Sequence, residues 1–197
     1  MTVWGKLALF IIAATIPAVI LGPILDKIGF MDAARSMPQL VAWNAIIFGI
    51  LLYLCDRYGL WVKRMENMTF GQAMIIGVAQ AIAIIPGTSR SGITMTAGRA
   101  LGFERPEAAR FSFLLGIPAI AGAGVLKLGT AISEGHPISG DQLLTAAFTF
   151  IVALATIAVL MKLVKVTSFL PFAIYRVALG VTLLALIYSG YSFGTVH

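Results

Sequence analysis

Long apolar runs separated by short polar segments organise this chain. Runs of this length predict membrane-spanning helices, because lipid admits only helices and closed barrels, and barrel strands are far shorter. We expect about five spans, which are Leu7–Leu25, Gln39–Leu54, Phe111–Leu126, Gln142–Met161 and Val177–Phe193. The predicted fold class is an all-α integral membrane protein, with residues 1–197 forming a single transmembrane domain.

One apolar stretch does not fit a simple span. Phe70–Ile85 reaches only about 24 Å as a helix, Ser91–Ala100 is shorter still, and Pro86-Gly87 interrupts the two. Two short helical arms that meet at such a break are typical of a re-entrant hairpin with its tip near the membrane midplane. We therefore predict a re-entrant helix-loop-helix hairpin over about residues 70–100.

Basic residues favour this return path over a crossing. If the hairpin returns, one side of the membrane carries ten basic residues and the other carries three; if it crosses, the division is five to eight. Cytoplasmic segments carry the excess of lysine and arginine, so the uneven division is preferred and the hairpin enters from the cytoplasmic side. The ten are Lys6, Arg57, Lys63, Arg64, Arg99, Arg105, Arg110, Lys162, Lys165 and Arg176, and the three are Lys27, Arg35 and Lys127, in predicted loops or at span ends.

Composition agrees with a membrane protein and excludes several other classes. Hydrophobic residues make up 59% of the chain and charged residues 11%, with a mean hydropathy of +0.96. The net charge of +6 comes from basic residues that lie between the apolar spans. We interpret these residues as a topology signal, so no nucleic-acid partner is expected. The single cysteine, Cys55, excludes an intramolecular disulfide or a cysteine metal cluster, and His136 and His197 lie outside the apolar runs. We expect Met1–Leu25 to be a retained span, because its uncharged run is longer than that of a signal peptide.

The stretch Pro86-Gly87-Thr88-Ser89-Arg90-Ser91-Gly92-Ile93-Thr94 carries the candidate chemistry. An arginine at membrane depth costs several kcal/mol unless a cavity, water or an anion receives it. Ser89 or Ser91 is a suitable N-cap for a new helix, whose free N–H groups and partial positive charge suit a phosphate. The guanidinium of Arg90 can pair with phosphate oxygens. These residues predict an anion pocket, most simply for phosphate; the alternative is a solvated loop.

This motif resembles the PGxSRSxxT motif of the bacterial undecaprenyl-diphosphatase (bacitracin-resistance) family. The similarity extends to Gly71-Gln72-Ala73, Gly77-Val78-Ala79-Gln80 and Phe111-Ser112-Phe113-Leu114-Leu115, and to Ser168–Arg176 near the C-terminus. It covers essentially the whole chain.

The resemblance implies an enzyme that removes one phosphate from undecaprenyl diphosphate, a polyprenyl lipid carrier of peptidoglycan synthesis. It also implies an inverted-repeat fold with two re-entrant hairpins, in a multi-pass protein of the bacterial plasma membrane. A divalent cation, Mg²⁺ or Ca²⁺, is implied as well, although no ligands for it are identifiable in this chain. We keep a homodimer as a hypothesis. Transferred onto this sequence, the catalytic candidates are Arg90, Ser89 and Ser91, and the substrate-binding candidates are Thr88, Arg90, Ser91, Thr94, Gly87 and Gln80. Gln80 is the polar residue of its arm and either faces the pocket or is a hydrogen-bonded core residue.

The sequence departs from the family in one respect. The resemblance implies a preceding N-terminal portion with an (E/Q)xxxE motif, a serine-rich turn and a histidine. Nothing in Met1–Met68 matches that portion, so we expect it to be lacking here. The eight acidic residues lie in predicted connecting loops. Glu104 and Glu107 are expected to pair with Arg105 or Arg110. Phosphoanhydride cleavage needs a proton handler, so we expect this chain to hold the anion-binding half of a site and to have little hydrolase activity alone. The alternative is a lipid-phosphate binding or translocating protein without catalysis.

Overall fold

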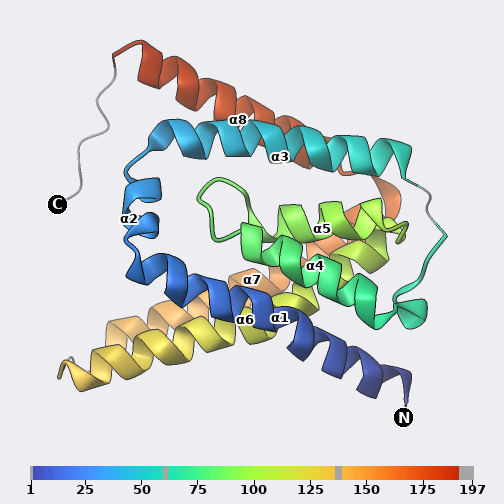
Figure 1. The fold of residues 1–197 in the computed structure, drawn as a ribbon, viewed down its shortest axis with the longest axis horizontal. Helices are drawn as coiled ribbons and strands as arrows, with labels where there is room; N and C mark the ends of the chain where they lie inside the picture. Colours follow the sequence, from blue (N-terminus) through green and yellow to red (C-terminus); the bar gives the residue numbers. More distant parts are fainter. Residues whose placement is uncertain (1, 60–61, 136–138, 191–197) are drawn as a thin grey trace.

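The computed structural model describes residues 2–59, 62–135 and 139–190 of this chain. The described part is helical, with two short helical arms enclosed by longer helices (Figure 1). In chain order the elements are α1 (Val3–Lys27), α2 (Phe30–Arg35), α3 (Pro38–Tyr58), the 3₁₀ helix η1 (Met65–Asn67), α4 (Phe70–Ile82), α5 (Arg90–Ala100), α6 (Arg105–Ser133), α7 (Gly140–Val166) and α8 (Leu170–Tyr188).

Five helices, α1, α3, α6, α7 and α8, are long and apolar enough to cross a membrane, which confirms the five predicted spans. Several predicted ends were wrong. The third and fifth predicted spans begin too late, since α6 starts at Arg105 and α8 starts at Leu170. The first helix extends beyond Leu7–Leu25 at both ends and contains Pro17 and Pro23, which a membrane helix tolerates where neighbours re-satisfy its backbone. Lys127 lies inside α6 and Arg176 inside α8, so neither belongs to a loop. Residues 191–193 of the last predicted span and His136 and His197 lie outside the described residues.

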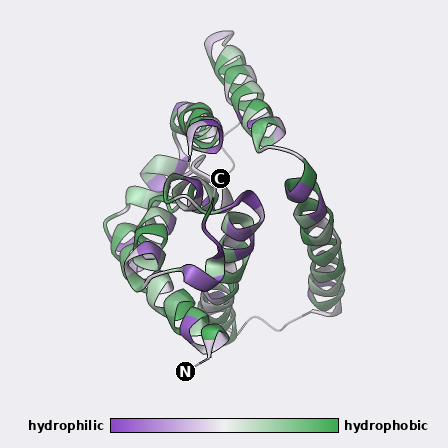
Figure 2. Ribbon diagram, turned by 90° about the vertical axis from the view of Figure 1, so that its right-hand side faces the viewer, coloured by the Kyte–Doolittle hydropathy of each residue, from purple (hydrophilic) through white to green (hydrophobic). Residues whose placement is uncertain are grey.

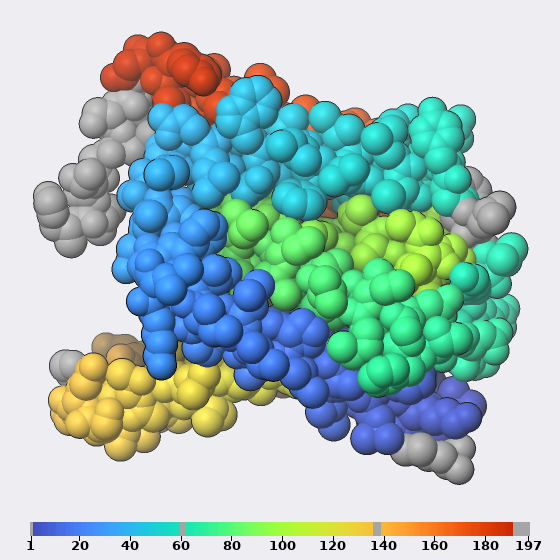
Figure 3. Space-filling view, in the orientation of Figure 1, coloured from blue at the N-terminus to red at the C-terminus, as the bar shows by residue number. Residues whose placement is uncertain are grey.

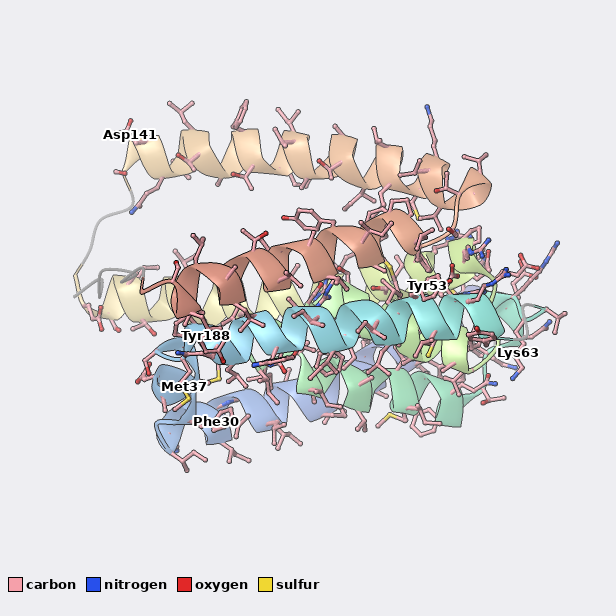
Figure 4. All side chains as sticks on the ribbon, turned by 90° about the horizontal axis from the view of Figure 1, so that it is seen from above. Phe30, Met37, Tyr53, Lys63, Asp141 and Tyr188 are labelled. Atoms are coloured by element: carbon pink, nitrogen blue, oxygen red, sulfur yellow. The ribbon has the colours of Figure 1, made fainter. Side chains whose placement is uncertain are left out.

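The arms α4 and α5 form a hairpin that lies between α1 and α3 (Figures 1 and 3). Its two ends meet: the Lys63 N–H donates to the Gly102 carbonyl at 3.1 Å, and the Glu104 N–H donates to the Lys63 carbonyl at 3.0 Å. The chain therefore returns to the end of the bundle from which it started. Figure 4 shows Tyr53 and Lys63 at that end, and Met37 and Tyr188 at the opposite end.

The turn of the hairpin, residues 83–89, is packed against α3. The Asn44 side chain donates to the Pro86 carbonyl at 2.8 Å. Gly87 has φ +85°, and a Cβ there would collide with the backbone of Val41. Because the hairpin base contacts Asp56 and its turn contacts Val41, the hairpin extends along about fifteen residues of α3, roughly 22 Å.

Apolar side chains cover the outside of the molecule. Hydrophobic residues dominate along the helices in Figure 2. Among the described residues of α7, Val164 alone is buried, whereas Phe148, Ile151 and Val159 are exposed. Surfaces of this kind suit lipid rather than water.

A buried ionic cluster ties four elements together at the base of the hairpin. Asp56, which is 2% exposed, accepts from Arg99 Nε at 2.9 Å, from Arg105 Nε at 2.8 Å and from the Phe169 N–H at 3.0 Å. The expectation that all acidic residues lie in loops was therefore wrong, since Asp56 sits in α3. Arg105 pairs with Asp56, and Glu107 accepts instead from the Met65 N–H at 3.0 Å.

Candidate anion-binding site at the hairpin turn

Arg90 is the first residue of α5 and its side chain lies between the two arms and α6. Its Nη1 donates to Gln80 Oε1 at 3.2 Å. A Cβ at Gly116 would overlap the guanidinium, so glycine at that position makes the room that the side chain occupies. No carboxylate in the described part of the chain pairs with Arg90. The guanidinium is half-buried and its charge is not neutralised by a protein anion.

Ser89 is the N-cap of α5, one of the two candidates that the sequence offered. Its Oγ accepts from the Gly92 N–H at 3.3 Å. Its φ of +64° is the one positive value at a non-glycine residue in the described chain. Strained backbone of this kind persists where the surroundings require it, and it clusters at ligand sites. With only one of its first N–H groups capped by a side chain, the α5 N-terminus retains donors and a partial positive charge for an anion.

Thr94 does not line an open pocket. Its hydroxyl lies 2.6 Å from Ser112 Oγ and 2.9 Å from the Arg90 carbonyl, and the residue is 1% exposed. Ser91, by contrast, is partly exposed beside Ser89 and lines a cavity. Thr94 thus joins the first turn of α5 to α6, while the two serines face the space in front of the helix.

Arg176, in α8, contributes a second guanidinium to the turn. Its Nη2 donates to the Gly87 carbonyl at 2.7 Å, and its Nε donates to the Ala45 carbonyl at 3.5 Å. A Cβ on Gly92 would collide with its Nη1. Arg176 was predicted to be a loop charge. It is, however, the one Asp, Glu, Lys or Arg residue after Lys165 and lies in an apolar run, the signal that identified Arg90.

Three buried polar atoms near the turn have no hydrogen-bond partner: Gln80 Nε2, Thr88 Oγ1 and Arg176 Nη1. Gln80 is 2% exposed and Thr88 is fully buried. Gln80 is therefore a buried residue that orients Arg90. Unpaired buried polar groups are costly, so these three around the start of α5 require an explanation, which a bound ligand would supply.

A cavity of about 180 Å³ adjoins these residues between α3, α5, α7 and α8. Ser89, Ser91, Gly92 and Arg176 form its polar part. The remaining walls are largely apolar and come from Leu52, Met95, Leu160, Phe169, Phe172 and Tyr175. A polar end with apolar walls matches an amphipathic molecule better than a free inorganic ion.

The described residues around Arg90 do not supply the ligands that a divalent cation would need. No group of three or more His, Cys, Asp or Glu side chains that could hold a metal occurs among the described residues. Asp56, the buried acid, already accepts from two arginines and a backbone N–H. The side chains around Arg90 are cationic, amide or hydroxyl groups, which suit an anion and not a metal ion.

The hairpin turn is packed against neighbouring helices, with Ser89 exposed and Arg90 half-buried at its end. Asn44 of α3 and Arg176 of α8 donate to its carbonyls, and Thr88 is fully buried. Fold and site together define a class: a multi-pass α-helical membrane protein with an arginine-bearing helical hairpin inside the helix bundle.

Comparison with known proteins identifies the family. Residues 3–182 match the family described as bacitracin resistance protein BacA, and the chain belongs to it. It is 45% identical to an undecaprenyl-diphosphatase of Erythrobacter litoralis, covering 91% of this chain and 69% of that protein. An undecaprenyl-diphosphatase of Ruegeria pomeroyi is 43% identical over 94% of this chain and 69% of its own length. One from Maricaulis maris is 45% identical over 91% of this chain and 68% of its own length.

Proposed function

We propose that this chain binds undecaprenyl diphosphate in a bacterial plasma membrane and takes part in its hydrolysis to undecaprenyl phosphate and inorganic phosphate. The observation that carries the proposal is the unneutralised Arg90 at the N-terminus of α5, held by Gln80 and accommodated by Gly116. Relatives that are 41–45% identical to this chain over the aligned residues carry the name undecaprenyl-diphosphatase.

The reaction adds the oxygen of one water molecule to the terminal phosphorus and breaks its bond to the bridging oxygen. That oxygen keeps the electron pair and leaves with the lipid phosphate, while the protons of the water pass to solvent and phosphate. Charge builds on the phosphoryl and bridging oxygens during transfer. Arg90, the free N–H groups of α5 and the hydroxyls of Ser89 and Ser91 are placed to stabilise that charge.

We infer that the hairpin enters the membrane from the cytoplasmic side and returns to it. Its paired ends and its reach of roughly 22 Å along α3 support this, since a full crossing needs about 30 Å. Lys127 and Arg176 lie in helices and no longer count as loop charges, which leaves nine basic residues on one side of the membrane and two on the other. This division still favours the returning hairpin. Peptidoglycan carrier recycling and bacitracin resistance follow from this function.

The described residues supply the anion-binding part of the reaction. No carboxylate within them pairs with Arg90 or Gln80. We propose that a companion segment or chain supplies the proton handling that the reaction needs. The divalent cation that the family implies, Mg²⁺ or Ca²⁺, would be held by that companion segment or chain and not by the residues around Arg90. Its chemistry would be to offset phosphate charge.

The test is phosphate release from undecaprenyl diphosphate in detergent or lipid nanodiscs, with Mg²⁺ or Ca²⁺. This chain and its Arg90→Ala variant are compared alone and after extension with an upstream family segment. We expect substantial release in the extended form alone, reduced at least a hundredfold by Arg90→Ala, with the exposed Lys162→Ala as control. Strong arginine-dependent release by the 197-residue chain would contradict the split site. Arg90-dependent lipid binding without hydrolysis in either form would indicate the binding or translocating protein.

A further inference from the structure

Arg176 is a second cation at the hairpin turn that the proposed chemistry does not yet use. It is 9% exposed, and no acidic residue pairs with it in the described chain. Two of its nitrogens donate to the Ala45 and Gly87 carbonyls, and these bonds brace the turn. Nη1 remains buried without a partner. A side chain needed only to brace the turn would not require that third donor, because a buried unpaired N–H costs free energy.

The two guanidiniums flank the start of α5 on opposite faces. Arg90 points toward Gln80 and Gly116, on the side of α4 and α6. Arg176 Nη1 lies against Gly92, two residues further along α5. Two residues rotate an α-helix by about 200°, so these contacts lie on nearly opposite faces of the same N-terminus. No carboxylate of the described residues pairs with either cation, so each can receive one charged centre of an anion bound at this N-terminus.

The surroundings of the two cations differ in a way that orients such an anion. Arg176, Ser89 and Ser91 line the cavity whose other walls are largely apolar, whereas Arg90 is not among its lining residues. A lipid diphosphate has its apolar chain on one phosphate and not on the other. The phosphate that carries the chain is therefore matched to the Arg176 side, and the terminal phosphate to the Arg90 side.

We propose that Arg176 Nη1 binds the phosphate that stays on the lipid, and that the cavity between α3, α5, α7 and α8 receives the first part of its apolar chain. The proposal rests on the proposed function for the identity of the lipid. Arg176 then contacts both substrate and product, whereas Arg90 acts on the phosphate that is removed. Arg176 consequently determines affinity for lipid monophosphate, and Arg90 does not.

The experiment measures binding of undecaprenyl monophosphate to the full chain in nanodiscs by equilibrium titration. We expect Arg176→Ala to weaken binding at least tenfold, Arg176→Lys to weaken it less because a charge is kept, and Arg90→Ala to change it less than threefold. Lys162→Ala, which removes an exposed cation of α7, is the matched control. Folded Arg176→Ala protein that binds the monophosphate within twofold of wild type would overturn the proposal.

A second variant keeps the test decisive if Arg176→Ala does not fold. Leu160→Trp fills the cavity from α7 without changing the turn. We expect it to weaken binding of undecaprenyl monophosphate and to leave binding of inorganic pyrophosphate unchanged. If Leu160→Trp changes binding of the two probes equally, or does not change binding of the lipid, the apolar chain of the lipid lies elsewhere. Either result would overturn the cavity assignment. Neither binding measurement involves hydrolysis, so Arg176-dependent binding together with no hydrolysis by the extended form would support this inference while contradicting the proposed enzyme.

Discussion

The guanidinium of Arg90 and the side-chain oxygen of Gln80 are joined across the two arms of the hairpin by a hydrogen bond of 3.2 Å. Gln80 is 2% exposed, and its Nε2 has no partner. A neutral amide therefore holds the arginine in place while leaving its positive charge available to a ligand. A carboxylate at the same position would hold the arginine equally well and cancel that charge.

Gln80→Glu is expected to lower affinity for undecaprenyl diphosphate by about tenfold or more, because an ion pair must be broken before the anion binds. Gln80→Leu removes the acceptor and leaves the charge, so its loss of affinity should be smaller. The measurement is equilibrium binding of the lipid, with Gln72→Glu in the exposed first turn of α4 as the control. Equal affinities of the Gln80→Glu and wild-type proteins would show that Arg90 does not bind the anion.

Gly116→Ala should displace Arg90 without unfolding the protein. The added Cβ would overlap the Arg90 guanidinium, which is the flexible end of a long side chain and can move away. We expect diphosphate binding to fall about tenfold, about 1.4 kcal/mol, with little change in the unfolding temperature. Gly122→Ala on the same helix is the control, since a Cβ there meets nothing within 4 Å. Wild-type affinity in Gly116→Ala would mean that the position of Arg90 is not critical.

Sequence reasoning found the parts of the fold and site whose signals are local. Apolar runs located the five spans, and Pro86-Gly87 located the break. Ser89 and Ser91 were both candidate N-caps, and the structure selects Ser89, so α5 begins at Arg90, one residue before the predicted arm. The lone cation in an apolar run identified Arg90. The same signal was present for Arg176, but it lies only six residues into α8, so it was assigned to the loop before that helix.

Long-range partners had no signal in a single sequence. Asp56 and Arg99 are 43 positions apart, and Asp56 was assigned to a charged connection because charged residues follow it. Nothing in the sequence distinguishes Gly116 from Gly122 and Gly124, which lie in the same apolar run. The structure gives Gly116 a different role beside Arg90, and a Cβ on either of the other two would meet no neighbour.

The Asp56 cluster should contribute strongly to stability. Asp56→Ala leaves Arg99 buried without its carboxylate, and breaking a buried pair costs about 3–5 kcal/mol. We expect a large fall in the unfolding temperature in detergent. The control is Asp32→Ala, whose pair with Arg35 is exposed and worth at most about 1 kcal/mol. If both variants melt together with the wild type, the cluster does not hold the hairpin base.

Ser89 allows its structural and chemical roles to be separated. Glycine adopts the φ of +64° without strain and costs little as an N-cap, so Ser89→Gly should be at least as stable as wild type. Ser89→Ala keeps the strain and loses the cap, and should be less stable by about 1 kcal/mol. Both variants lack the hydroxyl that faces the cavity beside Ser91 and Arg176, so both should lose diphosphate affinity to a similar degree. Thermal unfolding and lipid titration on the same three proteins separate the two roles. Full affinity in Ser89→Gly would show that the hydroxyl serves the helix start and not the ligand.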